Sequence, residues 1–219
     1  MSQQQQAERT PPALRLYLVT PTVDDTAALT RDLAAALEAA DFAAVLLRLA
    51  AADERTLINR VKALVPVVQR SGAALVLDGH AEIVARSGAD GAHLMGIEAF
   101  SAALGSLKPE RIAGCGGLAT RHDAMLAAES GADYVMFGQP EAGGHRPAFE
   151  AIIERIEWWT EVFQIPSVGF AASLDEIGPL AAAGADFVAI GDHVWADPRG
   201  VAASIKAAAE RLAASKALA

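Results

Sequence analysis

The chain has 219 residues, of which 53% are hydrophobic and 21% are charged, and its formal net charge is −9. This acidic chain has no cluster of Lys or Arg, so we expect no nucleic acid and no anionic membrane as a partner, but a small-molecule substrate. Its single cysteine, Cys115, excludes an intrachain disulfide, and no apolar run reaches the ~18–20 residues of a membrane span, so we expect a cytoplasmic protein.

Residues 1–13 are polar, with a run of glutamines, and are predicted to form a disordered tail. Residues 14–219 contain no segment that resembles a linker. A single α/β barrel commonly takes about 200–250 residues, so we expect one domain over this range.

Short apolar runs alternate with segments of helical pattern along the whole domain. The predicted strands span residues 16–20, 43–47, 74–77, 92–95, 111–115, 134–137, 165–169 and 187–190. The predicted helices span residues 25–40, 53–71, 81–87, 99–104, 120–130, 148–164, 173–184 and 197–216. Eight such pairs predict an α/β fold, a single (β/α)₈ TIM barrel. The rival is a doubly wound open sheet, but its usual glycine-rich turn is missing after the first strand, where Thr20-Pro-Thr-Val-Asp24 stands.

Local signals mark several helix boundaries. Thr120 with Asp123 and Ser173 with Glu176 have the spacing of capping boxes, and Asp197 followed by proline predicts the start of the last helix. Pro66 lies inside the second helix and is expected to kink or split it.

A Gly-Ala-Asp phrase recurs directly before predicted strands. It occurs at Gly88-Ala-Asp90, Gly131-Ala-Asp133 and Gly184-Ala-Asp186, with a weaker copy at Ala40-Asp41. The spacing of about two strand–helix units supports a repeated architecture.

In a barrel the active site forms where strands end and loops begin, so polar residues after the strands are the candidates. They are Arg48, Asp78, His80, Glu98, Thr120, His122, Gln139, Glu141, His145, Arg146, Ser173, Asp192 and His193. Four of the five histidines fall in these segments, whereas His93 lies within the fourth strand. No zinc-ligand spacing is present.

Two charged residues at strand ends each allow two interpretations. Arg48 should meet a carboxylate or a bound anion, and a salt bridge with Asp78 is as good an expectation as a ligand. Asp78 could cap a helix or bind a hard metal.

Several phrases resemble one known family. These are Leu16-Tyr-Leu-Val-Thr20, Leu46-Leu47-Arg48, Ala89-Asp-Gly-Ala-His-Leu94, Ala132-Asp-Tyr-Val-Met-Phe-Gly138 and Ala183-Gly-Ala-Asp-Phe-Val-Ala-Ile190. Together they resemble the thiamine-phosphate synthase and thiazole tautomerase superfamily of (β/α)₈ barrels, from Leu16 to about Ala214. The synthases join a pyrimidine pyrophosphate to a thiazole phosphate with Mg²⁺, and the resemblance implies that transferase activity, in thiamine biosynthesis, here.

The resemblance also implies roles for particular residues. Arg48 and Arg146 would hold pyrophosphate, and Asp78 and Glu98 would bind Mg²⁺. The catalytic histidine of the tautomerases aligns close to Ala119, with His122 as a possible substitute. If the chemistry has instead changed, His80 or His122 is the acid/base candidate. The implied substrate-binding residues are Gly138, His145, Ala171, Ala172, Gly191 and Asp192.

Departures from the family pattern leave other functions open. The Gly-Gly after the seventh strand is replaced by Ala171-Ala172, and a serine region after the eighth by Gly191-Asp192. The added Cβ atoms restrict the approach of a phosphate there, and an ionised Asp192 would oppose it. The alternative is that Asp192 turns away, to cap the following turn or to pair with Arg199. The alternatives are acid/base chemistry on a non-phosphorylated molecule, or a non-catalytic descendant that binds a metabolite or partner protein through Trp158-Trp159. A homo-oligomer is left open.

Overall fold

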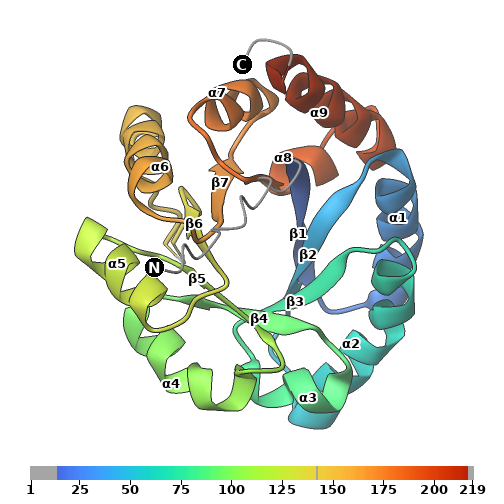
Figure 1. The fold of residues 1–219 in the computed structure, drawn as a ribbon. Helices are drawn as coiled ribbons and strands as arrows, with labels where there is room; N and C mark the ends of the chain where they lie inside the picture. The colour runs from blue at the N-terminus through green and yellow to red at the C-terminus, as the bar shows by residue number, and fades with distance from the viewer. Residues whose placement is uncertain (1–13, 142, 217–219) are drawn as a thin grey trace, which may run out of the picture.

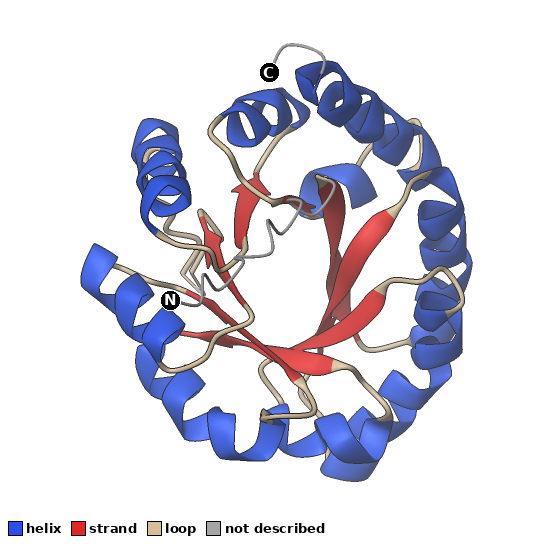
Figure 2. Ribbon diagram, viewed as in Figure 1, coloured by secondary structure: helices blue, strands red, loops and turns tan. Residues whose placement is uncertain are grey.

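The computed structural model describes residues 14–141 and 143–216, and these form a closed barrel of eight parallel strands in sequence order. The predicted tail at residues 1–13 and the last three residues lie outside the described residues. Figure 2 shows the strands as an inner ring with the helices outside it. The predicted single TIM barrel is confirmed, and the open-sheet rival is excluded because β1 pairs with β8.

The strands, numbered as in Figure 1, are β1 (Arg15–Val23), β2 (Phe42–Leu49), β3 (Ala74–Asp78), β4 (Gly91–Met95), β5 (Ile112–Gly116), β6 (Tyr134–Phe137), β7 (Ser167–Ala171) and β8 (Phe187–Ile190). The helices are α1 (Thr26–Ala39), α2 (Glu54–Gln69), η1 (Ala81–Ile83), α3 (Val84–Ser87), α4 (Ile97–Leu107), α5 (Arg121–Glu129), α6 (Phe149–Val162), η2 (Leu174–Glu176), α7 (Ile177–Ala182), α8 (Asp192–Trp195) and α9 (Val201–Lys216). Several strands extend past their predicted ends, so Arg48, Asp78 and Ala171 lie inside strands rather than after them.

Three local predictions need correction. The α2 helix runs unbroken through Pro66, because Leu57, Val61 and Val68 bury one face of the helix and offset the lost backbone hydrogen bond. Ser173 makes no side-chain cap, and the Glu176 carboxylate, which would complete the predicted capping box, binds the guanidinium of Arg146 instead.

The last helix also begins later than predicted, at Val201. Asp197 does not continue into a helix because its carboxylate accepts hydrogen bonds from the backbone and guanidinium of Arg199. Such local bonds compete with helix formation, and Gly200, with φ of 88°, turns the chain before the helix starts.

The repeated Asp residues join neighbouring strands at their N-terminal ends. The carboxylates of Asp90, Asp133 and Asp186 accept the backbone N–H of Leu75, Ala113 and Ser167 at 2.7, 2.7 and 2.8 Å. Each Asp also donates its own N–H to the carbonyl of that same residue. This end of a TIM barrel serves stability rather than chemistry, so the repeat is structural.

The buried side chains form two clusters, one inside the barrel and one between the strands and the surrounding helices. Alternate residues of each strand point inward, and the outward ones pack against the helices. The inner cluster consists of Tyr17, Val19, Ala44, Leu46, Val76, Tyr134, Met136, Val168, Phe170 and Ala189. By the same alternation, Arg48 and Asp78 face inward, at the C-terminal end of the barrel.

We predict that Asp186→Ala lowers the free energy of unfolding by about 1–3 kcal/mol, because the N–H of fully buried Ser167 loses its acceptor. Chemical denaturation measures the change. Asp186→Asn keeps an acceptor oxygen and should lose less, and exposed Asp175→Ala gives the background value. Equal losses for all three variants would contradict a structural role for the repeat.

Candidate active site

Arg48 is fixed at the mouth of the barrel by β1 and α8. Its Nε donates to the carbonyl of Thr20 at 2.5 Å, and one of its terminal nitrogens pairs with the carboxylate of Asp192. Arg48 therefore does not form the expected salt bridge with Asp78. The expected pairing of Asp192 with Arg199 is also wrong, because Arg199 binds Asp197. The Asp192 side chain is 75% exposed, so an incoming anion can compete for the guanidinium.

Arg146 is held by protein groups on several sides. Its Nε donates to Gly138 O at 2.7 Å, one terminal nitrogen donates to Phe170 O at 2.7 Å, and both terminal nitrogens bind the Glu176 carboxylate at 3.0 and 2.8 Å. The two side chains of this ion pair are only 16% and 18% exposed. The bidentate pair ties the β6–α6 loop to η2, and the bond to Phe170 ties it to β7.

Two carboxylates occupy the ends of β7 and β8, where barrels commonly receive a phosphate. Glu176 accepts the backbone N–H of Ala172 at 2.8 Å, and Asp192 opens α8 directly after Gly191. Ala171 is fully buried at the end of β7. An amide that could donate to a phosphate is thus already engaged, and the two nearby carboxylates occupy the guanidinium groups of Arg146 and Arg48.

The remaining predicted site residues are spread over the rim. His80 has a left-handed backbone with φ of 49°, and its ring nitrogen lies 3.2 Å from Glu82. Glu98 and His122 are exposed in the first turns of α4 and α5, and His145 is exposed in the β6–α6 loop. The structure brings Arg48 and Asp192 together but contains no contact that links these four.

Trp158 and Trp159 do not form an exposed contact surface. Trp159 is 1% exposed, and its indole N–H donates to Ile165 O at 2.8 Å. Trp158 is half-buried, stacks edge-on against Phe163, and lies under the guanidinium of Arg121 at 4.8 Å. Trp159 is buried and therefore cannot take part in a partner contact, whereas half-buried Trp158 leaves the predicted contact untested.

A buried polar chain crosses the interior of the barrel. The hydroxyls of Tyr17 and Tyr134 are 2.8 Å apart, and Tyr134 Oη lies 3.0 Å from Nδ1 of His93. Nε2 of His93 lies 2.8 Å from Oε1 of Gln139, just past β6. The residues Tyr17, Tyr134, His93 and Gln139 are called the polar chain below.

Two glycines make room for the polar chain. A Cβ on Gly114 would lie 2.1 Å from the Tyr134 ring, and one on Gly116 would lie 2.5 Å from His93 Nε2 and 2.9 Å from Gln139 Oε1. A larger residue at either of these two positions would displace the hydrogen-bonded side chains. Sequence reasoning placed His93 in its strand but did not connect it to the tyrosines; the available signal was a histidine at an inward position of an otherwise apolar strand.

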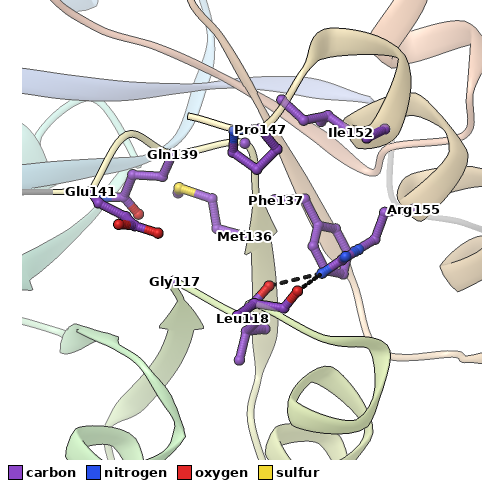
Figure 3. A pocket seen from close by; sticks show the side chains of 12 residues that line it. Gly117, Leu118, Met136, Phe137, Gln139, Glu141, Pro147, Ile152 and Arg155 are labelled. Carbon is purple, nitrogen blue, oxygen red and sulfur yellow. Dashed lines mark hydrogen bonds between the residues drawn. The ribbon is translucent and has the colours of Figure 1, made fainter. Parts of the chain in front are cut away.

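A cavity of about 80 Å³ opens beside Gln139, between the exits of β5 and β6 and helix α6. In Figure 3 Gln139 and Glu141 lie at one end, Met136, Phe137 and Pro147 line the middle, and Arg155 lies at the other end. Arg155 donates to the carbonyls of Leu118 and Ala119 at 2.8 and 3.2 Å. The cavity thus has polar ends and an apolar middle.

Comparison with known proteins identifies the family. The model of the thiamine monophosphate synthase family matches residues 16–194. The thiamine-phosphate synthase of Rhodospirillum centenum is 39% identical over 87% of this chain and 94% of its own length. The chain belongs to the thiamine monophosphate synthase family. A thiamine-phosphate synthase of Hyphomonas neptunium is 33% identical over 90% of this chain and 92% of its own length.

Solved structures support the fold of this family member. A thiamine phosphate pyrophosphorylase from Pyrococcus furiosus superposes with a TM-score of 0.76 at 20% identity, over 92% of this chain and 96% of that one. The family model and the two relatives confirm the predicted resemblance. No helix in the described ranges has the length and apolar character needed to cross a membrane.

The described residues offer few carboxylates that could bind Mg²⁺. Among residues 14–141 and 143–216, no three His, Cys, Asp or Glu side chains cluster closely enough to hold a metal by themselves. Mg²⁺ commonly uses one or two protein carboxylates together with substrate phosphates and water. Asp78 offers a half-buried carboxylate on the inner face and Glu98 an exposed one, so the set fits a Mg²⁺ that arrives with pyrophosphate.

Burial lowers the pKa of His93 below its ordinary value of 6.5, although Asp78 and the bond to Gln139 act in the opposite direction. The unfolded chain therefore takes up the proton first as the pH falls, and stability decreases below about pH 6.5. We predict that the free energy of unfolding falls by up to about 1.4 kcal/mol per pH unit between about pH 6.5 and pH 5.5 from this residue.

Denaturant titrations across this pH range measure the slope. His93→Gln should have a shallower slope than the unmodified protein, and exposed His122→Gln should leave it unchanged. Equal slopes for the unmodified protein and His93→Gln would mean that His93 is not held neutral by burial.

Proposed function

We propose that this chain is a thiamine-phosphate synthase, which joins a pyrimidine pyrophosphate to a thiazole phosphate. The observation that carries the proposal is the 39% identity to a thiamine-phosphate synthase over 94% of that protein's length. The inward positions of Arg48 and Asp78 at the C-terminal end of the barrel support it, since barrel chemistry takes place there. A cytoplasmic location and self-association stay predictions.

In this proposal Arg48 binds the pyrophosphate. Its guanidinium is already oriented by the Thr20 carbonyl, and the exposed Asp192 carboxylate exchanges for a pyrophosphate oxygen. Arg146 contributes positive charge from the other side of the mouth while it holds its loop through Glu176. Asp78 and Glu98 would hold Mg²⁺, which supplies charge neutralisation to the leaving pyrophosphate.

The reaction is a substitution at the methylene carbon of the pyrimidine. The bond from this carbon to the pyrophosphate oxygen breaks, and its electron pair leaves with pyrophosphate. The lone pair of the thiazole ring nitrogen then forms the new carbon–nitrogen bond, which leaves a positive charge on the thiazole ring. Fixed cations stabilise the charge that develops on the leaving group, and the barrel mouth holds the two rings together. His80 and His122 stay candidates for proton transfer on the rim.

We predict that the purified protein forms thiamine phosphate from the two substrates with Mg²⁺. Arg48→Gln should lower kcat/KM by about 100-fold, because one charge-assisted contact to the leaving group is lost. The control is Arg211→Gln, which removes an exposed guanidinium of α9 that pairs with Asp175. Absence of product from the unmodified protein would contradict the proposal.

One observation favours a second candidate, acid/base chemistry on a non-phosphorylated molecule. The Ala172 amide is occupied by the Glu176 carboxylate, and Asp192 adds a second negative charge at the same end of the barrel. To test it, inorganic phosphate is titrated into the unmodified protein and into a triple variant that combines Asp192→Ser, Ala171→Gly and Ala172→Gly. Binding only by the variant, with no thiamine phosphate formed, would favour this candidate.

A further inference from the structure

The directions of the hydrogen bonds in the polar chain follow from counting donors. If Nε2 of His93 carries the proton, it donates to Gln139 Oε1, and Nδ1 accepts from Tyr134, whose oxygen accepts from Tyr17. If each bond ran the other way, Gln139 would donate to His93, His93 to Tyr134 and Tyr134 to Tyr17. The hydroxyl hydrogen of Tyr17 would then have no acceptor among the described residues. A buried donor without an acceptor is strongly disfavoured, so the first arrangement holds.

This arrangement fixes the amide of Gln139. Its oxygen faces His93, which is fully buried, and its nitrogen must therefore point the other way. Gln139 lines the cavity at the exit of β6, on the face of the barrel where chemistry takes place. A pair of N–H donors is thus presented to the site by a neutral side chain in a fixed orientation.

The surroundings of this amide indicate what it binds. Glu141 lies at the same end of the cavity, and its negative charge disfavours a phosphate there. Met136 and Phe137 provide an apolar wall. The cavity volume of about 80 Å³ is about that of two or three water molecules, so it admits the edge of a ring rather than a whole substrate.

We propose that Gln139 is a specificity-determining residue whose amide N–H donates to a neutral ring nitrogen of a substrate heterocycle, and that His93 and Tyr134 are positioning residues that hold this amide in one orientation. The proposal rests on the proposed synthase function, in which the pyrimidine presents such a nitrogen, whereas the thiazole nitrogen is the nucleophile that forms the new bond. Gln139 was among the residues expected near the site from the sequence, but without a role.

Variants of Gln139 separate binding from structure. Gln139→Glu keeps an acceptor for His93 Nε2–H but has no N–H donor, and Gln139→Met has neither group. Both should raise the KM of the pyrimidine substrate about tenfold with kcat less affected, because one hydrogen bond to that substrate is lost. KM is measured for each substrate with the other saturating, and a rise confined to the thiazole substrate would contradict the proposed contact.

A matched pair of tyrosine variants tests the positioning. Tyr134→Phe removes the donor to His93 Nδ1, so the ring no longer has to keep its proton on Nε2 and the Gln139 amide can flip. Tyr17→Phe also removes a buried hydroxyl but leaves the bond from Tyr134 to His93 in place. We expect Tyr134→Phe to raise the same KM that the Gln139 variants raise, by about threefold. Tyr17→Phe should leave this KM unchanged, although the free energy of unfolding should fall by a similar amount in both tyrosine variants.

The outcomes distinguish this inference from the proposed function. If the protein makes thiamine phosphate and neither KM changes in the Gln139 variants, the amide is a structural cap on His93 and the inference is overturned, whereas the synthase function stands. If the protein makes no thiamine phosphate, calorimetry with the phosphate-free pyrimidine and thiazole alcohols decides. Weaker binding of the pyrimidine alcohol by Gln139→Glu supports the inference, and equal or absent binding by both proteins overturns it.

Discussion

The hydrogen bond between His93 and Tyr134 in the middle of the barrel constrains much of the active-site side of this protein. It allows a polar pair to lie among the apolar interior side chains, because each hydrogen-bonding group of the pair is matched. It requires glycine at positions 114 and 116 of β5, where a Cβ would collide with the ring of Tyr134 or with Nε2 of His93. Burial also raises the pKa of Tyr134 and lowers that of His93, so both stay neutral.

Around this neutral centre the mouth of the barrel carries paired charges. Arg48 meets Asp192 and Arg146 meets Glu176, so each cation that the family resemblance assigns to pyrophosphate already has a carboxylate partner. The pairs differ in burial: Asp192 is exposed and can exchange for a ligand, whereas the Arg146–Glu176 pair is largely enclosed. An anionic substrate would therefore be recognised mainly through Arg48, and Arg146 would keep the loop after β6 in place.

Sequence reasoning predicted the barrel well, because each unit repeats the same local signals. The Gly-Ala-Asp phrase marks a helix end and a strand start, and its Asp bonds to the neighbouring strand in three copies. The alternation of inward and outward residues then places Arg48 and Asp78 at the mouth. Partners distant in sequence could not be predicted: Arg48 and Asp192 are 144 positions apart, and Tyr17 and Tyr134 are 117 apart. Local patterns contain no information about which of several carboxylates a guanidinium meets across a closed barrel.

The most direct test of this account is the protonation state of the His93 ring, measured by ¹⁵N NMR of the histidine side chains at neutral pH and assigned with His93→Gln. The account predicts a neutral ring with the proton on Nε2 and a hydrogen-bonded, unprotonated Nδ1. A ring with its proton on Nδ1, or a charged ring with both nitrogens protonated, would contradict the direction of the polar chain and the orientation of Gln139 that follows from it.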